Sequence, residues 1–224
     1  MRNSSVLVKR SEDSRRRRQR LLQNLIRHLK PGLQDRIRFL GAFLRRPACV
    51  GALAPSSQAL ARAMVRCCAP ETSRTVVELG PGTGAFTGLI LKQIGKNTKF
   101  FAVELDPVFA SGLRARFPDL TVYNDTAERL DKYLVMNGEK KADLIVSGLP
   151  WASLPLAVQE RIFEAVLKSL LPGGVFATFG YVHARWFPNA QRFRRRLEQH
   201  FSRVEVSPVV WRNFPPAFIY RCVR

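Results

Sequence analysis

The sequence has few cysteines, few acidic residues and no long apolar run. Its four cysteines, Cys49, Cys67, Cys68 and Cys222, form no CxxC pair and no metal-ligand spacing with a histidine, which argues against a disulfide framework or a zinc site. No apolar stretch approaches the ~20 residues of a membrane-spanning helix, and the first twenty residues lack the apolar segment of a signal peptide. We therefore expect a protein of a reducing compartment that meets a membrane only at its surface.

Acidic residues are scarce beside basic ones. The 224 residues contain 17 Asp and Glu against 37 Lys and Arg, a formal net charge of +20. Residues 1–46 alone contain 14 basic and 3 acidic residues. Such a field favours a polyanionic partner, either nucleic acid or an anionic lipid surface. The length and the 46% hydrophobic content fit one α/β domain with a short extension.

Two basic amphipathic helices are predicted before that domain. Residues 1–20 are arginine-rich and are interpreted as a flexible basic arm. In residues 21–50 apolar side chains recur at helical spacing, and the second helix ends before Pro47. An apolar stripe of this kind can pack on its own domain, but with flanking arginines it is typical of a helix in a membrane interface. The residues predicted to bind the membrane are Leu33, Ile37, Arg38, Leu40, Leu44, Arg45 and Arg46.

A glycine-rich loop carries the clearest chemical signal. The run TVVELGPGTGAFT from Thr75 predicts a strand, a tight loop and a helix, and its glycines allow positive φ and close backbone approach. A GxGxG pattern alone also suits a dinucleotide. However, Glu78 would repel a phosphate and attract the cationic amino group of a methionine moiety. The loop therefore favours S-adenosylmethionine over a dinucleotide.

The ends of three further predicted strands add to this site. KFFAVELDP ends a strand at Glu104, about twenty residues after the loop, where a carboxylate can bond both ribose hydroxyls. A third strand leads to Asp125, and a fourth, in ADLIVSGLP, ends at Ser147. In an open α/β sheet the ligand lies at the carboxyl ends of the strands. The methyl acceptor is therefore expected beside the residues after Ser147.

These segments resemble the motifs of a known class. VVELGPGTGAFT, AVELDP, NDTAERL and IVSGLPW resemble motifs I to IV of class I S-adenosylmethionine-dependent methyltransferases. FLGAFLRRPACVGALAPSS, IVSGLPW and NFPPAFIYR further resemble the bacterial phospholipid N-methyltransferases, a likeness that covers about residues 33–224. The resemblance implies a Rossmann-like, doubly wound α/β sheet of seven strands with a closing β-hairpin in residues 51–224, after N-terminal amphipathic helices.

The same resemblance implies an activity. Its members are peripheral enzymes on the inner face of the bacterial cytoplasmic membrane that methylate phosphatidylethanolamine stepwise to phosphatidylcholine, with S-adenosylmethionine converted to S-adenosylhomocysteine. No nucleic acid or metal is expected to bind, and the oligomeric state is left open. The implied cofactor contacts are Glu78, Gly80, Gly82, Gly84, Glu104, Asp125, which faces the adenine amine, and Ser147.

Methylation of an amine requires a free lone pair on nitrogen, so the site must remove a proton. Tyr181 and His183, just past the fifth predicted strand, are the candidate catalytic residues, although a histidine there is commonly structural. Trp151 could hold a methylated ammonium on its ring face, or it could simply pack. The residues predicted to line the acceptor pocket are Leu149, Pro150, Trp151 and Tyr181.

Two alternative substrates were weighed against phosphatidylethanolamine. An ornithine-type aminolipid also presents an amine near an interface. An adenine of ribosomal RNA would also explain the charge, but the enzymes that methylate it resemble one another in an Asn-or-Asp-Pro-Pro-aromatic motif that reads the flipped base. The segment Ser147–Trp151 has neither the amide nor the doubled proline. A protein without catalytic activity is disfavoured by the complete set of cofactor motifs.

Overall fold

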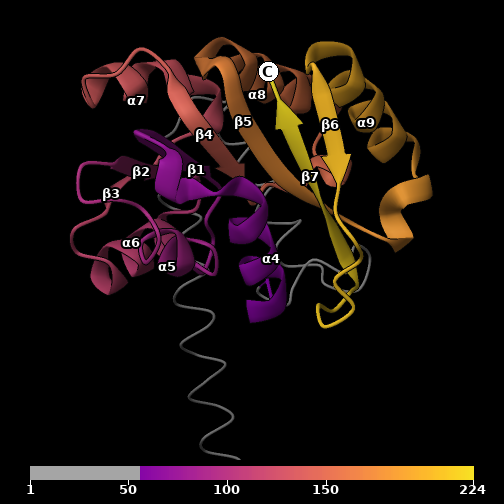
Figure 1. Ribbon diagram of the computed structural model, residues 1–224, viewed down its shortest axis with the longest axis horizontal. Helices are drawn as coiled ribbons and strands as arrows, with labels where there is room; N and C mark the ends of the chain where they lie inside the picture. The colour runs from indigo at the N-terminus through magenta and orange to yellow at the C-terminus, as the bar shows by residue number, and fades with distance from the viewer. Residues whose placement is uncertain (1–55) are drawn as a thin grey trace, which may run out of the picture. The chain divides into compact units, whose positions relative to one another are not determined.

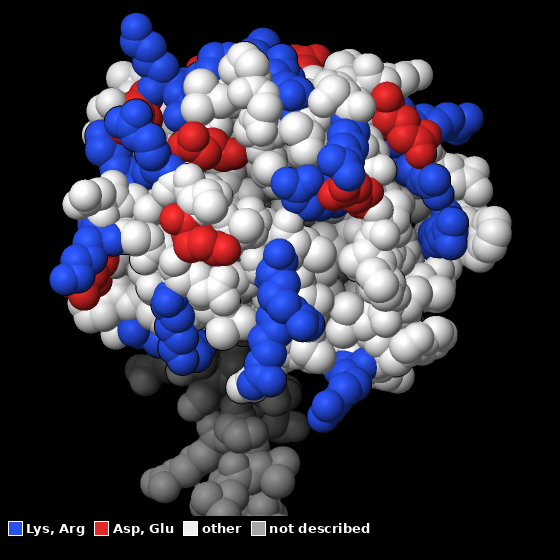
Figure 2. Space-filling model, viewed as in Figure 1, with Lys and Arg blue, Asp and Glu red and all other residues white. Residues whose placement is uncertain are grey.

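The computed structural model describes residues 56–224 (Figure 1). The predicted basic arm, residues 1–20, and the predicted amphipathic helices of residues 21–50 lie outside the described residues, so these predictions stay untested. No described helix combines the length and the apolar character needed to cross a membrane. On the face shown in Figure 2, Lys and Arg are more numerous than Asp and Glu.

Seven strands form one sheet in the order β3-β2-β1-β4-β5-β7-β6. The first five strands of the chain run parallel, whereas β7 is antiparallel to both β5 and β6. This arrangement confirms the predicted doubly wound sheet with a closing hairpin. The strands are β1 (Thr75–Leu79), β2 (Lys99–Val103), β3 (Thr121–Tyr123), β4 (Ala142–Ser147), β5 (Leu170–Tyr181), β6 (Arg203–Val206) and β7 (Ala217–Val223).

Helices cover both faces of the sheet (Figure 1), because its central strands are apolar on both sides. Val76 of β1 faces the layer of α4, α5 and α6, and Val77 faces the layer of α7, α8 and α9. Four short 3-10 turns, η1 (Pro70–Thr72), η2 (Ala127–Arg129), η3 (Trp151–Ser153) and η4 (His183–Trp186), lie in the connections. The helices are α4 (Gln58–Cys68), α5 (Thr87–Ile90), α6 (Pro107–Arg116), α7 (Leu130–Met136), α8 (Leu156–Ser169) and α9 (Pro188–His200).

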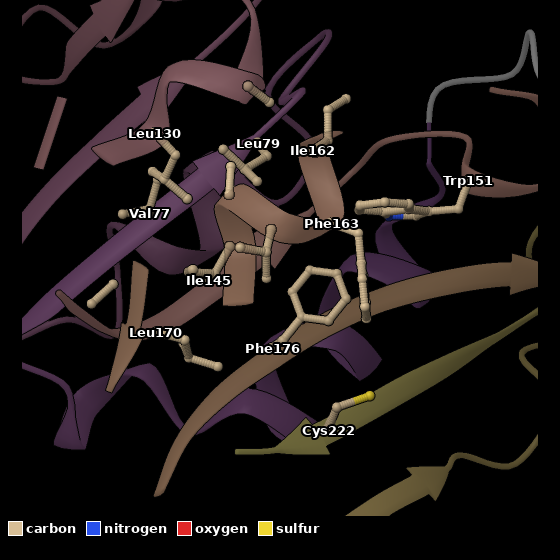
Figure 3. Close-up of a cluster of buried hydrophobic side chains, with 14 of the residues drawn as sticks. Val77, Leu79, Leu130, Ile145, Trp151, Ile162, Phe163, Leu170, Phe176 and Cys222 are labelled. Carbon is tan, nitrogen blue, oxygen red and sulfur yellow. The ribbon is translucent and has the colours of Figure 1, made fainter. Parts of the chain in front are cut away.

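The larger apolar cluster fills the layer of α7, α8 and α9 (Figure 3). Phe163 of α8 and Phe176 of β5 are fully buried in it. Their edges meet the ring of Trp151, at centroid distances of 6.3 and 5.8 Å. This cluster anchors the start of the loop after β4, which is the predicted acceptor side.

The helix starts follow local capping chemistry. Ser57 accepts a hydrogen bond from the backbone N–H of Leu60 and so caps α4. Asp106 caps α6 in the same way, and Pro107 takes its first position. The helix predicted after the glycine loop is present as α5, but it has only four residues and continues as turns. Gly84 and Gly88 at its start weaken a continuous helix.

Candidate active site

The glycine loop lies at the carboxyl end of β1, and two of its glycines need their special geometry. Gly80 has a φ of +66°, and a Cβ there would lie 2.6 Å from Cδ2 of Leu149. Gly82 has a φ of +56°, and a Cβ there would meet nothing within 4 Å. The first glycine thus lets the loop press against the acceptor loop, and the second leaves open space over the sheet. Gly84 shares the left-handed conformation and packs against α6 instead.

Glu78 is completely buried beneath this loop. Its Oε2 accepts a hydrogen bond of 2.7 Å from the hydroxyl of Thr87 in α5, while its Oε1 has no partner among the described residues. Burial raises the pKa of this carboxyl to about 8, and the bond from Thr87 only partly offsets that effect. An unpartnered buried carboxylate oxygen is costly unless a donor or a cation reaches it. The sequence did not single out Thr87.

Glu104 completes an acidic pair with Glu78. Its carboxylate accepts hydrogen bonds of 2.9 Å from the backbone N–H groups of Gly82 and Asp106, which fix it at the carboxyl end of β2. Burial raises its pKa, and its charge in turn helps to raise that of Glu78. Among residues 56–224, no Lys or Arg contributes to the pKa of either buried carboxyl, so the described part of the site lacks a positive charge.

S-adenosylmethionine suits a site that lacks positive charge, because it carries a cationic amino group and a sulfonium. It also carries two ribose hydroxyls. The open oxygen of Glu78 suits the amino group. The carboxylate of Glu104 has lone pairs left for hydroxyls after its two backbone bonds. The structure thus brings together Glu78, Gly80, Gly82 and Glu104 as expected. Their individual cofactor contacts stay predictions.

Asp125 lies two residues past β3 and is already engaged. Its Oδ2 accepts bonds of 2.5 Å from the hydroxyl of Tyr133 and 3.0 Å from Arg129, and Oδ1 accepts one from the N–H of Thr126. Although burial raises its pKa, these bonds together hold the pKa below its usual value. Asp125 is therefore ionised and fixed in place. Its predicted contact with the adenine amine remains a prediction, which would use a second lone pair of the same carboxylate.

Ser147 holds the acceptor loop together. It is fully buried at the end of β4, and its Oγ accepts hydrogen bonds from Nε1 of Trp151 at 3.0 Å and from the N–H of Leu149 at 3.3 Å. Both lone pairs of the hydroxyl oxygen are thereby used. The geometry gives Ser147 a supporting role in the loop, and its predicted cofactor contact is left without a direct observation.

Of the two roles open to Trp151, an ammonium-binding face or packing, the structure favours packing. Only 2% of the residue is exposed, and its ring stacks on that of Phe193 of α9, with centroids 4.5 Å apart and planes inclined by 12°. Figure 3 shows the ring beside the labelled Phe163, inside the apolar cluster. A ring so enclosed cannot offer an open face to an ammonium group. The ring is enclosed because Phe163 of α8 and Phe193 of α9 pack against it. Leu149 and Pro150, in contrast, are partly exposed.

A glutamine that the sequence reading missed supports the same loop. Gln159 of α8 is 2% exposed, and its Nε2 donates a hydrogen bond of 2.6 Å to the backbone carbonyl of Trp151. Gln159 shares the buried face of α8 with Ile162, Phe163 and Val166. A polar residue on an otherwise apolar stripe was the signal that could have revealed it.

Tyr181 and His183 lie together at the carboxyl end of β5, as expected. Their rings are stacked, with centroids 5.7 Å apart and planes inclined by 20°. Tyr181 is partly buried, and burial raises its pKa above the ordinary value of 10.0. It is therefore a neutral phenol near pH 7, which disfavours its predicted role as a proton acceptor. His183 is exposed, and its catalytic role remains a prediction.

Within residues 56–224, no group of three or more His, Cys, Asp or Glu side chains is placed to hold a metal ion. The titratable groups that gather at the carboxyl edge are instead the acidic pair and the Tyr181–His183 stack. Since the glycine loop above the acidic pair and the acceptor loop meet at Gly80 and Leu149, the site can hold a cationic cofactor next to a second substrate.

Comparisons with known proteins agree with this geometry. Residues 56–179, more than half of the chain, match the family model described as ribosomal RNA adenine dimethylase. The ornithine lipid N-methyltransferase of Singulisphaera acidiphila is 36% identical over 85% of this chain and 96% of that protein. The ribosomal RNA small subunit methyltransferase A of Acidobacterium capsulatum is 38% identical over 42% of this chain, but over only 33% of that protein.

A solved structure shows the same fold. The N-methyltransferase of Bradyrhizobium japonicum WM9 aligns with 73% of this chain and 93% of that chain, with a TM-score of 0.58 and 13% identity. Together, the fold, the site and these matches show that the chain is a class I S-adenosylmethionine-dependent methyltransferase. Within that class it belongs to the family of the ribosomal RNA adenine dimethylase model. Its methyl donor is S-adenosylmethionine and its product S-adenosylhomocysteine.

Proposed function

We propose that this protein methylates the amine of a membrane aminolipid, working as a peripheral enzyme on the inner face of a bacterial cytoplasmic membrane. The observation that carries the proposal is the chemistry of the acceptor loop. The side-chain polar groups of Ser147 and Trp151 bond each other. The carbonyls of Leu149 and Pro150 accept backbone N–H groups of the same loop. The loop therefore offers no side-chain amide or carboxylate to accept the exocyclic amine of an adenine.

The extents of the sequence matches point in the same direction. The match to the ribosomal RNA family model ends at residue 179 in β5, before η4 and the closing hairpin. The match to the ornithine lipid N-methyltransferase extends over almost all of that protein. The match to a ribosomal RNA small subunit methyltransferase A, in contrast, covers 42% of this chain and 33% of that protein. The more extensive of the two likenesses is thus to a lipid enzyme.

Among lipids, this relative favours an ornithine lipid as the acceptor over phosphatidylethanolamine. The resemblance to phospholipid N-methyltransferases still supports phosphatidylethanolamine as the second candidate, with phosphatidylcholine as its final product. Both lipids place an amine near the membrane interface. A partly apolar loop with Leu149 and Pro150 suits an alkylamine stem in either case.

The chain's own residues have three tasks in this reaction. Glu78 and Glu104 bind and orient the cofactor, which when bound supplies an electrophilic methyl group. Gly80 and Leu149 bring the cofactor loop against the acceptor loop, so that the amine can approach in line. The site must also make the amine neutral, which costs on the order of 4 kcal/mol at pH 7 for an amine of pKa about 10. Partial burial beside Tyr181 contributes to this.

A parallel assay tests the proposal. The full chain is incubated with labelled S-adenosylmethionine and, separately, with vesicles of ornithine lipid, vesicles of phosphatidylethanolamine and ribosomal RNA, and the products are identified by mass spectrometry. We expect methylated ornithine lipid at the highest rate. Methylated phosphatidylethanolamine alone would restore the second candidate. Labelled RNA without a lipid product would overturn the proposal.

A further inference from the structure

The edge of the sheet that holds the acceptor loop also carries large exposed aromatic side chains. Trp186 of η4 is 74% exposed, and Phe187 beside it 47%. In the loop that joins β6 to β7, residues 207–216, Trp211 is 73% and Phe214 83% exposed. We call these four residues the aromatic rim. Exposed aromatic residues gathered at one edge indicate an interaction surface.

Both segments of the aromatic rim leave the sheet at the same place. Tyr181, the last residue of β5, pairs with Ala217, the first residue of β7. The N–H of Val182 donates to the carbonyl of Pro216 across the same junction. In Figure 1 the yellow loop lies below the sheet beside the end of α4, where the amide oxygen of Asn213 accepts the N–H of Ser57. The rim is thus fixed to the domain at its base, while its rings project.

The charges around the aromatic rim have one sign. The segments 181–188 and 207–216 contain Arg185 and Arg212 but no Asp or Glu. The guanidinium of Arg185 lies over the ring of Trp186, 5.9 Å from its centroid. Along the lower edge of Figure 2, where the loop of residues 207–216 lies, the projecting charged side chains are mainly Lys and Arg. Tryptophan with neighbouring arginine is the composition of a surface that enters the headgroup region of a membrane.

We propose that the aromatic rim docks this enzyme on an anionic lipid surface and so turns the acceptor loop toward the membrane. The inference rests on the proposed function and adds a membrane contact within the methyltransferase domain itself. Because η4 directly follows Tyr181, insertion of Trp186 would bring the Tyr181–His183 stack to the headgroup level. A lipid amine could then reach the site while its acyl chains stay in the bilayer.

The tryptophans provide a direct test. The chain has three, and Trp151 is buried, so the fluorescence that vesicles can alter comes from Trp186 and Trp211. In full-length Trp186→Phe and Trp211→Phe, one rim tryptophan remains at a time. Vesicles of phosphatidylglycerol and phosphatidylcholine should shift the emission of each variant to shorter wavelength, and brominated acyl chains should quench it. The protein with both substitutions gives the fluorescence of Trp151 alone, which is subtracted as background.

A tryptophan at the other edge of the sheet is the matched control. Met136, 60% exposed at the end of α7, leads into the start of β4. In the doubly substituted background, Met136→Trp should show neither the shift nor the quenching. Equal quenching at Met136→Trp and at the rim would show adsorption without orientation and would overturn the proposal. An aqueous quencher that still reaches the rim tryptophans of vesicle-bound protein would do the same.

Affinity provides the second readout. Replacing both Trp211 and Phe214 by serine should weaken partition onto these vesicles at least tenfold, since each exposed ring is worth about one decade when it leaves water. Met136→Ser should change partition less than twofold. Unchanged partition of the rim variant, or protection of the rim by ribosomal RNA or by self-association instead of lipid, would refute the inference. Methylation of lipid dispersed in detergent should survive the rim substitutions, so failure of the rim is distinguishable from failure of the proposed function.

Discussion

The two halves of the carboxyl edge of the sheet differ in the groups that they bury and expose. At the carboxyl ends of β1 and β2, carboxyl groups are buried: Glu78 is completely enclosed and Glu104 is 4% exposed. Beside the carboxyl end of β5 and the amino end of β7, aromatic groups are exposed, as at Trp186 and Trp211. Each arrangement costs free energy in the isolated protein, because buried carboxyls lose hydration and exposed rings contact water. Both costs would be relieved by a partner of the complementary kind.

The boundary between the two halves is the loop after β4. Gly148 lies so close to the carbonyl oxygen of Gly80 that a Cβ there would be 2.4 Å from it. Behind this contact, Trp151 anchors the loop in the core. The comparison therefore predicts three separate effects. Substitutions in the loop should lower the free energy of unfolding, and substitutions in the acidic pair should weaken cofactor binding. Substitutions near the end of β5 should change only the reaction of the methyl acceptor.

The largest effect should follow from Trp151→Ala. Removal of a buried ring stacked on Phe193 should lower the free energy of unfolding by about 3–5 kcal/mol, measured by denaturant titration. Trp151→Phe should retain much of the packing but lose the hydrogen bond to Ser147. If Trp151→Ala kept its stability and instead changed the distribution of mono-, di- and trimethylated products, the ring would belong to the acceptor pocket after all.

The sequence predicted the cofactor half well because its information is local. A strand end, three glycines and an acidic residue lie within ten positions of one another, and the topology of a doubly wound sheet then places Glu104 beside them. The predicted doubly wound sheet follows from the same alternation of strand and helix. The helix predicted after the glycine loop has only four residues, because glycine makes a helix start weak.

The acceptor half was harder to predict because its side chains are positioned by distant ones. Trp151 follows a strand and could equally have faced a pocket. Phe163 and Phe193, which enclose it, come from two later helices. Burial of Tyr181, which raises its pKa, likewise depends on the packing of β5 against β7. The exposure of Trp211 could not be read from its neighbours, since apolar loop residues can face either way.

A second prediction concerns the acidic pair without cofactor. The folded pKa of Glu78 is about 8, above its ordinary value of 4.5, so the folded state holds this proton more tightly than the unfolded state. The free energy of unfolding should therefore fall as pH rises from about 5 to about 8, by on the order of 3 kcal/mol, since one pKa unit corresponds to ~1.4 kcal/mol. Thermal or denaturant unfolding across this range measures the slope.

Glu78→Gln isolates the contribution of this carboxyl. Without a charge to bury, the variant should be more stable than the natural protein at pH 8 and similar to it at pH 5. Glu71→Gln, at an exposed position of η1, is the control and should keep the natural slope. Parallel slopes for Glu78→Gln and the natural protein would show that other groups cause the pH dependence.

The third prediction separates cofactor binding from folding. Glu104→Ala removes a carboxylate expected to bind ribose hydroxyls, so S-adenosylmethionine affinity should fall by ~1.5–3 kcal/mol, as measured by calorimetry. Glu139→Ala, which breaks only a surface ion pair with Lys99, should leave affinity unchanged. A folded Glu104→Ala protein with natural affinity would remove Glu104 from the cofactor site.

The smallest effect is expected at the boundary of the acceptor, at Tyr181. Burial keeps the hydroxyl of Tyr181 protonated near pH 7, so it cannot take the proton of the lipid amine. Tyr181→Phe should therefore lower kcat by about tenfold or less. Loss of a general base typically lowers kcat by about 10²–10⁴-fold. At saturating cofactor, the rate of labelled methyl transfer should rise with pH in both proteins until the bound amine is neutral, with the same midpoint. His183→Gln in the same assay tests the remaining candidate, because loss of a base at that position would lower kcat by about 100-fold or more. A midpoint moved by Tyr181→Phe but not by His183→Gln would reverse this assignment and make the buried phenol part of the proton path.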